Sequence, residues 1–450
     1  MNAQKLHVVT IGTGLVLIAL GAVAEVDVER MPAPVRPVLE EATLVVDPLL
    51  FEQKISGPST NSGDHFGASV AGDASWTVVG APDQINAGDV GPGAANLFAR
   101  DGSAWIYDGV LTCPPTDSTC SNFGASVAID GEWLVVGAPG HVGTLTIGRV
   151  HVYRWNGSGF GLNRVLAAPS SPTNVLFGTS VAIDYPFLVV GTPGDDDGGT
   201  NAGAVYLFWY TSGAWAQFSK HVASDTGSAD DFGRAVSISG ETFVVGAPGH
   251  DTATVDNGAV YTFTRGALLW FEDDTVLLPS TTATNNAHFG EALSLMGDRL
   301  LVGAPDDNYL NTEGGRAWIY GRTPSDSWNP LANLYALDAF GHFGSSVSMG
   351  SGIAAIGASG SDRAVPDAGA VFVFVDDGGW QYEGGTTASD AHGGQLFGGS
   401  VALTPIGVIV GAEGDEELGG EAGAAYSYIL AIFTDGFESG DTAAWSRTQS

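Results

Sequence analysis

The dipeptide Phe-Gly recurs seven times along this chain, and a Gly-Ala-Pro-like triplet begins fourteen residues after each Phe. The intervals between successive Phe residues are 57, 54, 55, 57, 54 and 54. The phenylalanines are Phe66, Phe123, Phe177, Phe232, Phe289, Phe343 and Phe397, and the first residues of the triplets, here called corner glycines, are Gly80, Gly137, Gly191, Gly246, Gly303, Gly357 and Gly411. So regular a period indicates repeated units that each bury their apolar face only against their neighbours.

Each unit is predicted to contain four short strands. In the unit that starts at Phe177, the runs FGTSVAID, PFLVVGTP, AGAVYLFWY and GAWAQFSKH are rich in β-branched or aromatic residues and are separated by Gly, Asp and Pro. This punctuation and the alternation of apolar and polar residues favour strands over helices. Seven such units predict an all-β fold, a seven-bladed β-propeller of four-stranded antiparallel blades.

The two motifs are interpreted as structural. A glycine allows backbone conformations or close approaches that a Cβ atom would prevent, and a proline suits the end of a strand. We therefore expect the corner to end the second strand and let blades pack tightly. The Phe is expected to fill the space between adjacent blades.

The last unit lacks a fourth strand, which indicates how the ring closes. Its runs FGGSVALT, IGVIVGAE and GAAYSYI give three strands, whereas the segment before the first Phe-Gly resembles the fourth strand and exit loop of an interior unit. Residues 49–56 are therefore expected to supply the outer strand of blade seven, which removes an open sheet edge.

The two ends of the chain are expected to lie outside the propeller of residues 49–430. Residues 1–24 resemble a secretory signal peptide, with Lys5, an apolar stretch and a small-residue cleavage site at Ala22-Val23-Ala24; the alternative is an uncleaved membrane anchor. Residues 25–48 form a linker and residues 431–450 a tail. An exported chain with two nearby cysteines predicts one loop disulfide, Cys113–Cys120.

The chain is strongly acidic, with 50 Asp and Glu residues against 16 Lys and Arg and a formal net charge of −34. This balance argues against nucleic acid or an anionic membrane as partner. The acids either bind cations or keep an exported protein soluble.

Acidic residues gather in the loop after each corner, which suggests calcium. Ca²⁺ takes about six to eight oxygen ligands, and a short loop of acids with a glycine can wrap such an ion. The alternative is a solvated turn, because Asp, Asn and Gly are also common turn formers. The candidate ligands are Asp195, Asp197 and Asn201 in unit three, Asp306, Asn308, Asn311 and Glu313 in unit five, and Asp415, Glu417 and Glu421 in unit seven. Unit two is expected to bind none.

The paired Phe-Gly and Gly-Ala-Pro motifs resemble FG-GAP repeats, which form the seven-bladed propeller of integrin α subunits and of many bacterial exported proteins. The resemblance covers roughly residues 49–430. It implies a propeller, calcium in some loops, and extracellular binding or adhesion. The loops at 195–201 and 306–314 depart from the calcium-loop pattern of the family, and units six and seven read Gly-Ala-Ser and Gly-Ala-Glu at the corner. The tail at 433–446 resembles a C-terminal segment of exported bacterial proteins, which implies a sorting role.

No nucleophile elbow, zinc-protease motif or phosphate loop occurs in the sequence, so no catalytic residue is assigned. We expect a secreted or cell-surface, monomeric binding module for an extracellular protein or glycan, with no membrane span in the mature chain. The alternative is a propeller enzyme, a glycoside hydrolase or lyase acting on extracellular polysaccharide. Six tryptophans recur beside the third and fourth strands and are expected to pack the outer blades rather than bind sugars: Trp105, Trp155, Trp215, Trp270, Trp328 and Trp380.

Overall fold

The structure is a computed structural model of the 450-residue chain. It describes residues 7–11, 14–19, 22–26, 49–85, 93–114, 120–140, 148–168, 175–251, 255–267, 269–273, 277, 285–308, 313–323, 327–336 and 341–430. Every regular element within these ranges is a β-strand, as the sequence predicts. None of the described residues forms a helix that is long and apolar enough to cross a membrane.

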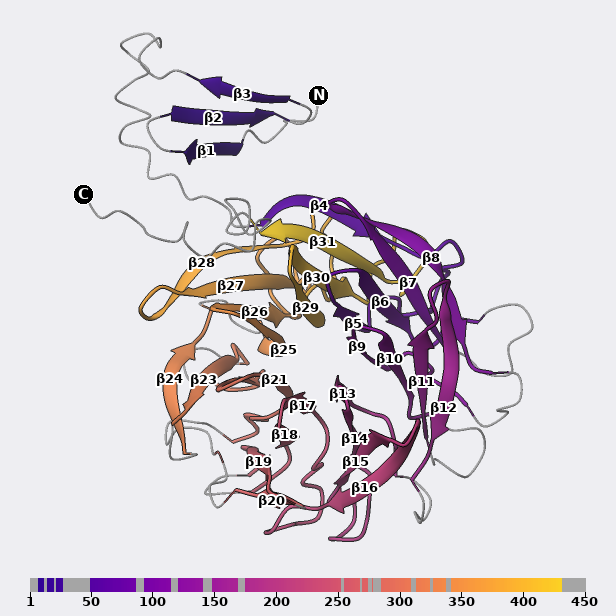
Figure 1. Cartoon of the computed structure of the whole chain (residues 1–450). Coiled ribbons are helices and arrows are strands. Elements are labelled where there is room, and N and C mark those ends of the chain that lie inside the picture. Colours follow the sequence, from indigo (N-terminus) through magenta and orange to yellow (C-terminus); the bar gives the residue numbers. More distant parts are fainter. Residues whose placement is uncertain are drawn as a thin grey trace.

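Seven four-stranded antiparallel sheets form a ring around an open centre (Figure 1). Blade 1 contains β5 (Ser69–Gly72), β6 (Trp76–Ala81), β7 (Ala94–Asp101) and β8 (Ala104–Thr112). Blade 2 contains β9 (Ser126–Asp130), β10 (Trp133–Ala138), β11 (Arg149–Trp155) and β12 (Phe160–Leu166). Blade 3 contains β13 (Val181–Asp184), β14 (Phe187–Thr192), β15 (Ala204–Thr211) and β16 (Ala214–His221). Blade 4 contains β17 (Val236–Ser239), β18 (Thr242–Ala247), β19 (Ala259–Arg265) and β20 (Trp270–Glu272).

The remaining blades repeat the same order, with the first strand nearest the centre. Blade 5 contains β21 (Ala292–Met296), β22 (Arg299–Ala304), β23 (Arg316–Arg322) and β24 (Trp328–Leu334). Blade 6 contains β25 (Phe343–Gly350), β26 (Ile353–Ala358), β27 (Ala370–Asp376) and β28 (Trp380–Thr386). Blade 7 contains β29 (Ser400–Thr404), β30 (Gly407–Ala412), β31 (Ala424–Leu430) and, as its outer strand, β4 (Leu49–Ile55).

The ring closes as the sequence predicts. Strand β4 pairs antiparallel with β31, in a register that sets Ile55 opposite Ala425 and Leu49 opposite Leu430. Because β4 precedes blade 1 in the chain and completes blade 7, opening the ring requires the loss of this pairing.

The N-terminal segment contains three further strands, β1 (His7–Ile11), β2 (Gly14–Ala19) and β3 (Ala22–Val26), which form a separate antiparallel sheet. The proposed signal sequence overlaps this sheet, and its cleavage stays a prediction. The expected linker, apart from residues 25 and 26, and the tail at 431–450 lie outside the described residues.

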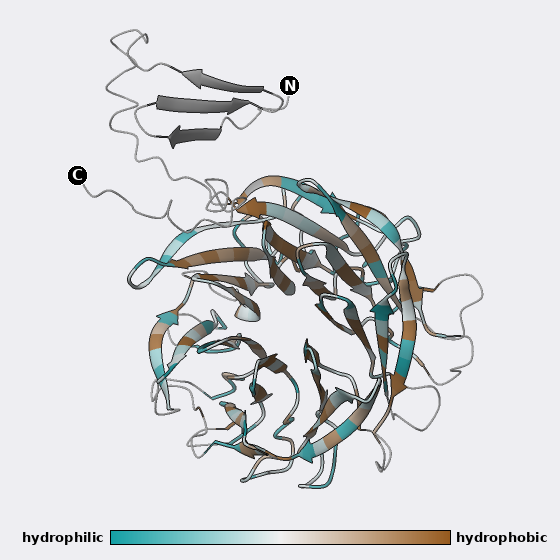
Figure 2. Ribbon diagram, in the orientation of Figure 1, coloured by the Kyte–Doolittle hydropathy of each residue, from teal (hydrophilic) through white to brown (hydrophobic). Residues whose placement is uncertain are grey.

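The core lies between blades. The second strands of blades 2, 3, 4, 6 and 7 are buried along their whole length, and they read as continuous apolar runs because both faces are covered. Figure 2 shows this as brown inner strands, against alternating brown and teal in outer strands such as β16. Phe397 packs with Val371 and Val373 of blade 6 and Val408 and Val410 of blade 7, which confirms that the repeated Phe fills the seam between blades.

The repeated glycines form the joint between neighbouring blades. A Cβ atom on the corner glycine Gly80 would lie 2.0 Å from the carbonyl oxygen of Gly124, which belongs to the Phe-Gly of the next blade. The same contact closes the ring, where a Cβ on Gly411 would lie 2.0 Å from the carbonyl oxygen of Gly67. Such approaches exclude any side chain, so the joint explains why both glycines of the motif recur.

Candidate functional site

A cavity of about 670 Å³ opens between the loops of blades 4, 5 and 6. It is lined by the loops that follow the corners and by the residues that precede each Phe-Gly. Its charged and imidazole-bearing lining residues are Asp231, Arg234, Asp256, His288, Glu291, Asp306 and His342. A cavity of this size and composition suits a polar or charged ligand.

The repeat places these side chains through a shared backbone conformation. The residue before each Phe-Gly has a positive φ in all seven blades, including 55° at Asp231, 52° at His288 and 48° at His342. Non-glycine residues adopt this conformation uncommonly. In five of the blades the structure gives a hydrogen bond that fixes it, since the amide of the residue donates to a carbonyl of the preceding blade, as His342 does to Glu313.

In the wall of the cavity one carboxylate lies between two imidazoles. The Nδ1 atoms of His288 and His342 lie 2.6 and 2.8 Å from the two carboxylate oxygens of Asp306. Asp306 follows the corner of blade 5, whereas the two histidines precede the Phe-Gly of blades 5 and 6. The cluster therefore crosses the seam between blades 5 and 6. In each histidine Nδ1 contacts Asp306, and Nε2 is the ring nitrogen that does not.

The shared hydrogen bonds change the proton affinities of all three groups. Hydrogen bonding to Asp306 outweighs burial and raises the pKa of His288 and of His342 above 6.5. Burial alone would raise the pKa of Asp306, but the hydrogen bonds from the two histidines lower it well below its usual range. The cluster thus holds a proton on the imidazole side to a higher pH than isolated histidines would.

The remaining cavity wall is mainly acidic. Arg234 lies 2.9 Å from Glu291 and so neutralises that carboxylate, while Asp256 and Asp231 add two further carboxylates. Burial raises the pKa of Asp231, opposed by the nearby Arg234. Four carboxylates thus face one guanidinium and two imidazoles, so the cavity is negative when the imidazoles are neutral.

A smaller version of the cluster joins blades 1 and 2. Asp83 stands at the position of Asp306, and its carboxylate lies 2.8 Å from Nδ1 of His65 and accepts a hydrogen bond of 3.2 Å from Asn122. An amide here replaces the second imidazole. The contact of Asp306 with two imidazoles is thus a variant of the contact that Asp83 makes between blades 1 and 2.

The candidate calcium ligands of blade 3 surround a lysine. Nζ of Lys220 lies 2.9 and 2.8 Å from the two carboxylate oxygens of Asp195 and 2.5 Å from Asp197. Asn201 has a φ of 52°, and its carbonyl oxygen accepts the amide hydrogen of Asp231. The structure thus brings Asp195 and Asp197 together and gives Asn201 a backbone role at the seam.

Blade 7 repeats this arrangement. Nζ of Lys54, on the closing strand, lies 2.9 Å from Asp415 and 2.7 Å from Glu417, and Glu421 takes the seam position of Asn201 with a φ of 56°. A third carboxylate, Asp390, lies 2.6 Å from the same ammonium.

The candidates in blade 5 are not gathered around one point. Asp306 belongs to the cavity cluster, Asn308 accepts the amide hydrogen of Glu313, and Glu313 has a φ of 50° at the seam. Asn311 lies outside the described residues.

These arrangements do not fit calcium in blades 3 and 7, because a lysine ammonium already lies among the oxygens that would coordinate it. In the part of the chain that the structure describes, no three His, Cys, Asp or Glu side chains gather as metal ligands. Calcium binding by the candidate ligands stays a prediction from the sequence.

Sequence reasoning assigned no role to Lys54, Lys220 or the paired histidines. The sequence did hold a clue to the lysines, because the chain has only three of them and both of those in the propeller lie on a fourth strand. His65, His288 and His342 share one position of the repeat, directly before Phe-Gly, and such repetition favours a loop or packing role. The structure shows that two residues at this repeated position, His288 and His342, meet at one carboxylate, Asp306, and so form a single cluster.

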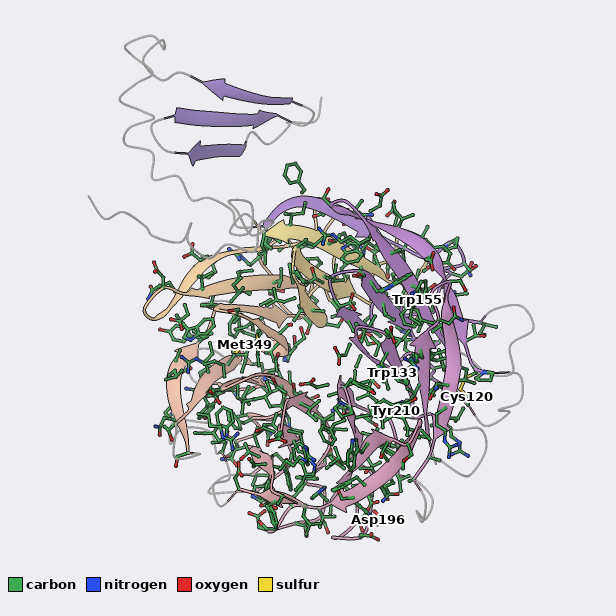
Figure 3. The ribbon with its side chains drawn as sticks, viewed as in Figure 1. Cys120, Trp133, Trp155, Asp196, Tyr210 and Met349 are labelled. Carbon is green, nitrogen blue, oxygen red and sulfur yellow. A yellow bond between two sulfur atoms is a disulfide. The ribbon has the colours of Figure 1, made fainter. Side chains whose placement is uncertain are left out.

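The aromatic residues pack mainly inside the blades. Trp105, Trp215, Trp270 and Trp328 are buried, and Trp155 and Trp380 are half-buried, as expected for outer-blade packing. At the turns of blades 2 and 3, Trp133 packs against Tyr210 with ring centroids 4.8 Å apart (Figure 3). Cys113 and Cys120 form a disulfide in the loop between units one and two.

The family comparison agrees with this architecture. The sequence profile of the FG-GAP repeat matches residues 164–208, 215–263, 328–374 and 380–428. Each match begins in or just before a fourth strand and ends in the third strand of the next blade, which is the same one-strand offset that β4 uses to close the ring. No curated protein matches the chain. The repeats and the seven-bladed ring show that this chain is an FG-GAP repeat β-propeller.

Proposed function

We propose that this protein is an exported, monomeric, non-enzymatic binding module, and that the cavity between blades 4, 5 and 6 receives a cationic group of an extracellular protein ligand. The observation that carries the proposal is the lining of this cavity, where four carboxylates face one guanidinium and two imidazoles. A lysine or arginine side chain would satisfy these carboxylates, whereas an anionic ligand would be repelled.

The charge of the whole chain supports the same class of ligand. A formal net charge of −34 attracts basic partners over distances set by the ionic strength and raises their association rate. Propellers also offer long loops on one face, on a rigid scaffold, which suits the recognition of an extended surface. Export rests on the N-terminal sequence, and secretion of the intact precursor tests it.

The test is the binding of a lysine- and arginine-rich peptide and of the same peptide with its lysines acetylated, measured by calorimetry at low and high salt. We expect the unmodified peptide to bind more tightly, and its affinity to fall as salt screens the charges. Equal affinities for the two peptides would overturn the proposal.

Two variants localise the binding. Glu291→Gln and Asp256→Asn each remove one negative charge from the cavity lining, and each is expected to weaken peptide binding by roughly threefold to tenfold. Glu241→Gln is the matched control, because Glu241 is exposed and pairs with Arg265 outside the cavity. An equal effect of all three variants would show that binding follows net charge rather than this cavity.

One observation favours a second function, hydrolysis or elimination on an extracellular polysaccharide. His288 and His342 each direct Nδ1 at Asp306, the arrangement by which a carboxylate orients an imidazole for proton transfer through Nε2. Release of new reducing or unsaturated ends from acidic and neutral polysaccharides, abolished by His288→Asn, would establish this function. Peptide binding without any such release would exclude it for the substrates tried.

A further inference from the structure

The carboxylate that lies deepest in the corner loops occupies one repeated position. It is the fourth residue after the corner glycine, and it is an aspartate in blades 3, 5 and 7, where Asp195, Asp307 and Asp415 are each 1% exposed. Its amide donates to the carbonyl three residues earlier, and its carbonyl accepts from the glycine just before the third strand, as Asp195 accepts from Gly203. Each carboxylate is thus fixed in the interior and needs a counter-charge there.

In blade 3 the counter-charge comes from the fourth strand. Lys220 on β16 lies directly opposite Tyr206 on β15, and its ammonium contacts Asp195 and Asp197 and lies 5.5 Å from the Tyr206 ring centroid. Burial alone would lower the pKa of Lys220, but its hydrogen bonds to Asp195 and Asp197 raise this pKa above its usual value. The ammonium therefore stays charged at neutral pH.

In blade 7 the same position is filled from the other end of the chain. Lys54 on β4 lies opposite Tyr426 on β31, and its ammonium contacts Asp415, Glu417 and Asp390. It lies 5.4 Å from the Tyr426 ring centroid. The closing strand thus contributes the charge that neutralises the last corner loop, so ring closure and charge neutralisation depend on the same segment.

In blade 5 the counter-charge for the buried aspartate comes from the third strand. Nη2 of Arg316 lies 2.6 Å from Asp307, both side chains are at most 1% exposed, and the guanidinium lies 4.6 Å from the Trp318 ring centroid. The residue opposite Trp318 on the fourth strand is then Asn333 rather than lysine.

Two of the other described corner loops serve as internal controls, whereas the deep position of blade 4 is His250, whose Nδ1 lies 3.1 Å from Asp230. The deep position is Gln84 in blade 1, bonded to Asn96, and Ser361 in blade 6. The residues opposite the matching third-strand positions are Val110 and Gly385. Where the deep residue is neutral, this fourth-strand position thus carries no lysine. Both lysines of the propeller contact a buried aspartate.

We propose that the ammonium groups of Lys220 and Lys54 take the place of a calcium ion in the corner loops of blades 3 and 7, so that these loops and the closure of the ring need no metal. A calcium ion would require the oxygens that the ammoniums already bind, at ligand distances of about 2.3–2.6 Å. Two positive ions cannot share one set of two or three carboxylates at such distances without strong repulsion.

The first test is thermal unfolding of the whole protein with calcium, with a chelator, and with neither. We expect one melting temperature in all three conditions. Lys220→Met and Lys54→Met keep most of the aliphatic stem and remove the charge, and each is expected to lower the melting temperature by roughly 5 °C or more. Arg100→Met is the control, since Arg100 is exposed and its guanidinium bonds only to backbone carbonyls; it should change little. A melting temperature that calcium raises and chelation lowers would overturn the proposal, as would lysine variants no different from Arg100→Met.

A second test needs no variant. An amine-reactive reagent followed by peptide mapping reports each of the three lysines separately. Lys54 and Lys220 should be labelled far more slowly in the folded than in the unfolded protein, at a rate that calcium leaves unchanged. Fast labelling of both in the folded protein, or labelling accelerated by calcium, would show that the ammoniums do not hold these sites.

Discussion

Two neighbouring aspartates in the corner loop of blade 5 differ in burial and in the groups they contact. Asp307 points inward, is 1% exposed and is neutralised by Arg316. Asp306 lies in the cavity wall, where it bonds two imidazoles. A shift of one residue therefore separates a carboxylate that stabilises the scaffold from one that lines the cavity. The inward position repeats as Asp195 and Asp415, whereas the outward one is glycine in blades 2, 3, 4, 6 and 7.

The largest expected effect is on the inward side. Arg316→Met leaves Asp307 buried without its guanidinium, and breaking a buried pair in this way typically costs about 3–5 kcal/mol. We expect the free energy of unfolding in urea to fall by about that amount, while peptide affinity per folded molecule stays the same. A loss of affinity with unchanged stability would reverse the roles assigned to the two aspartates.

The joint beneath both aspartates is expected to be nearly as sensitive. In Gly303→Ala the new Cβ would lie 2.0 Å from the carbonyl oxygen of Gly344, so blades 5 and 6 must separate, at a cost of about 2–3 kcal/mol. Gly297→Ala is the control, since no atom lies within 4 Å of its Cβ and only its φ of 54° opposes alanine. Urea unfolding of both variants measures the difference, and equal losses would contradict the close-packed joint.

The outward side should respond to pH. As the pH falls from about 8 to about 5, His288 and His342 take up protons and the cavity becomes less negative, because hydrogen bonding to Asp306 raises the pKa of both. Affinity for the basic peptide should fall by roughly tenfold across this range. Asp306→Asn removes the anion that raises these pKa values, so the fall should shift to lower pH. An affinity independent of pH would exclude the histidine cluster from the binding site.

The smallest effect expected is that of the outward carboxylate on stability. The raised pKa values of His288 and His342 stabilise the fold below about pH 6.5, and this contribution is lost as the pH rises through the raised values. The lowered pKa of Asp306 stabilises above about pH 3.9, and this contribution is lost as the pH falls through its lowered value. The melting temperature of Asp306→Asn should therefore differ most from that of the wild type near pH 5. The corresponding difference in the free energy of unfolding should be below about 1 kcal/mol, because the cluster is partly exposed to solvent. A larger effect at pH 8 than at pH 5 would contradict this sign.

The sequence predicted the scaffold better than the site, for a physical reason. Strands, corners and the closing role of residues 49–56 depend on patterns that recur, and repetition makes them visible. The site depends on how residues of different units meet across a seam. Asp306 with His342, or Lys54 with Asp415, are far apart in the chain, and spacing alone does not pair them. The ten candidate ligands were chosen because Asp, Glu and Asn carry side-chain oxygens, which does not distinguish an oxygen that meets a cation from one that holds a turn, as Oδ1 of Asn308 does.

The division between inward and outward carboxylates is tested most directly by the side-chain ammonium signals of the protein labelled with ¹⁵N-lysine. With two lysines in the propeller, we predict two slowly exchanging ammonium resonances at neutral pH, from Lys54 and Lys220, which neither calcium nor the basic peptide shifts. Ammonium signals that are absent through fast exchange with water, or that move when calcium is added, would contradict the account.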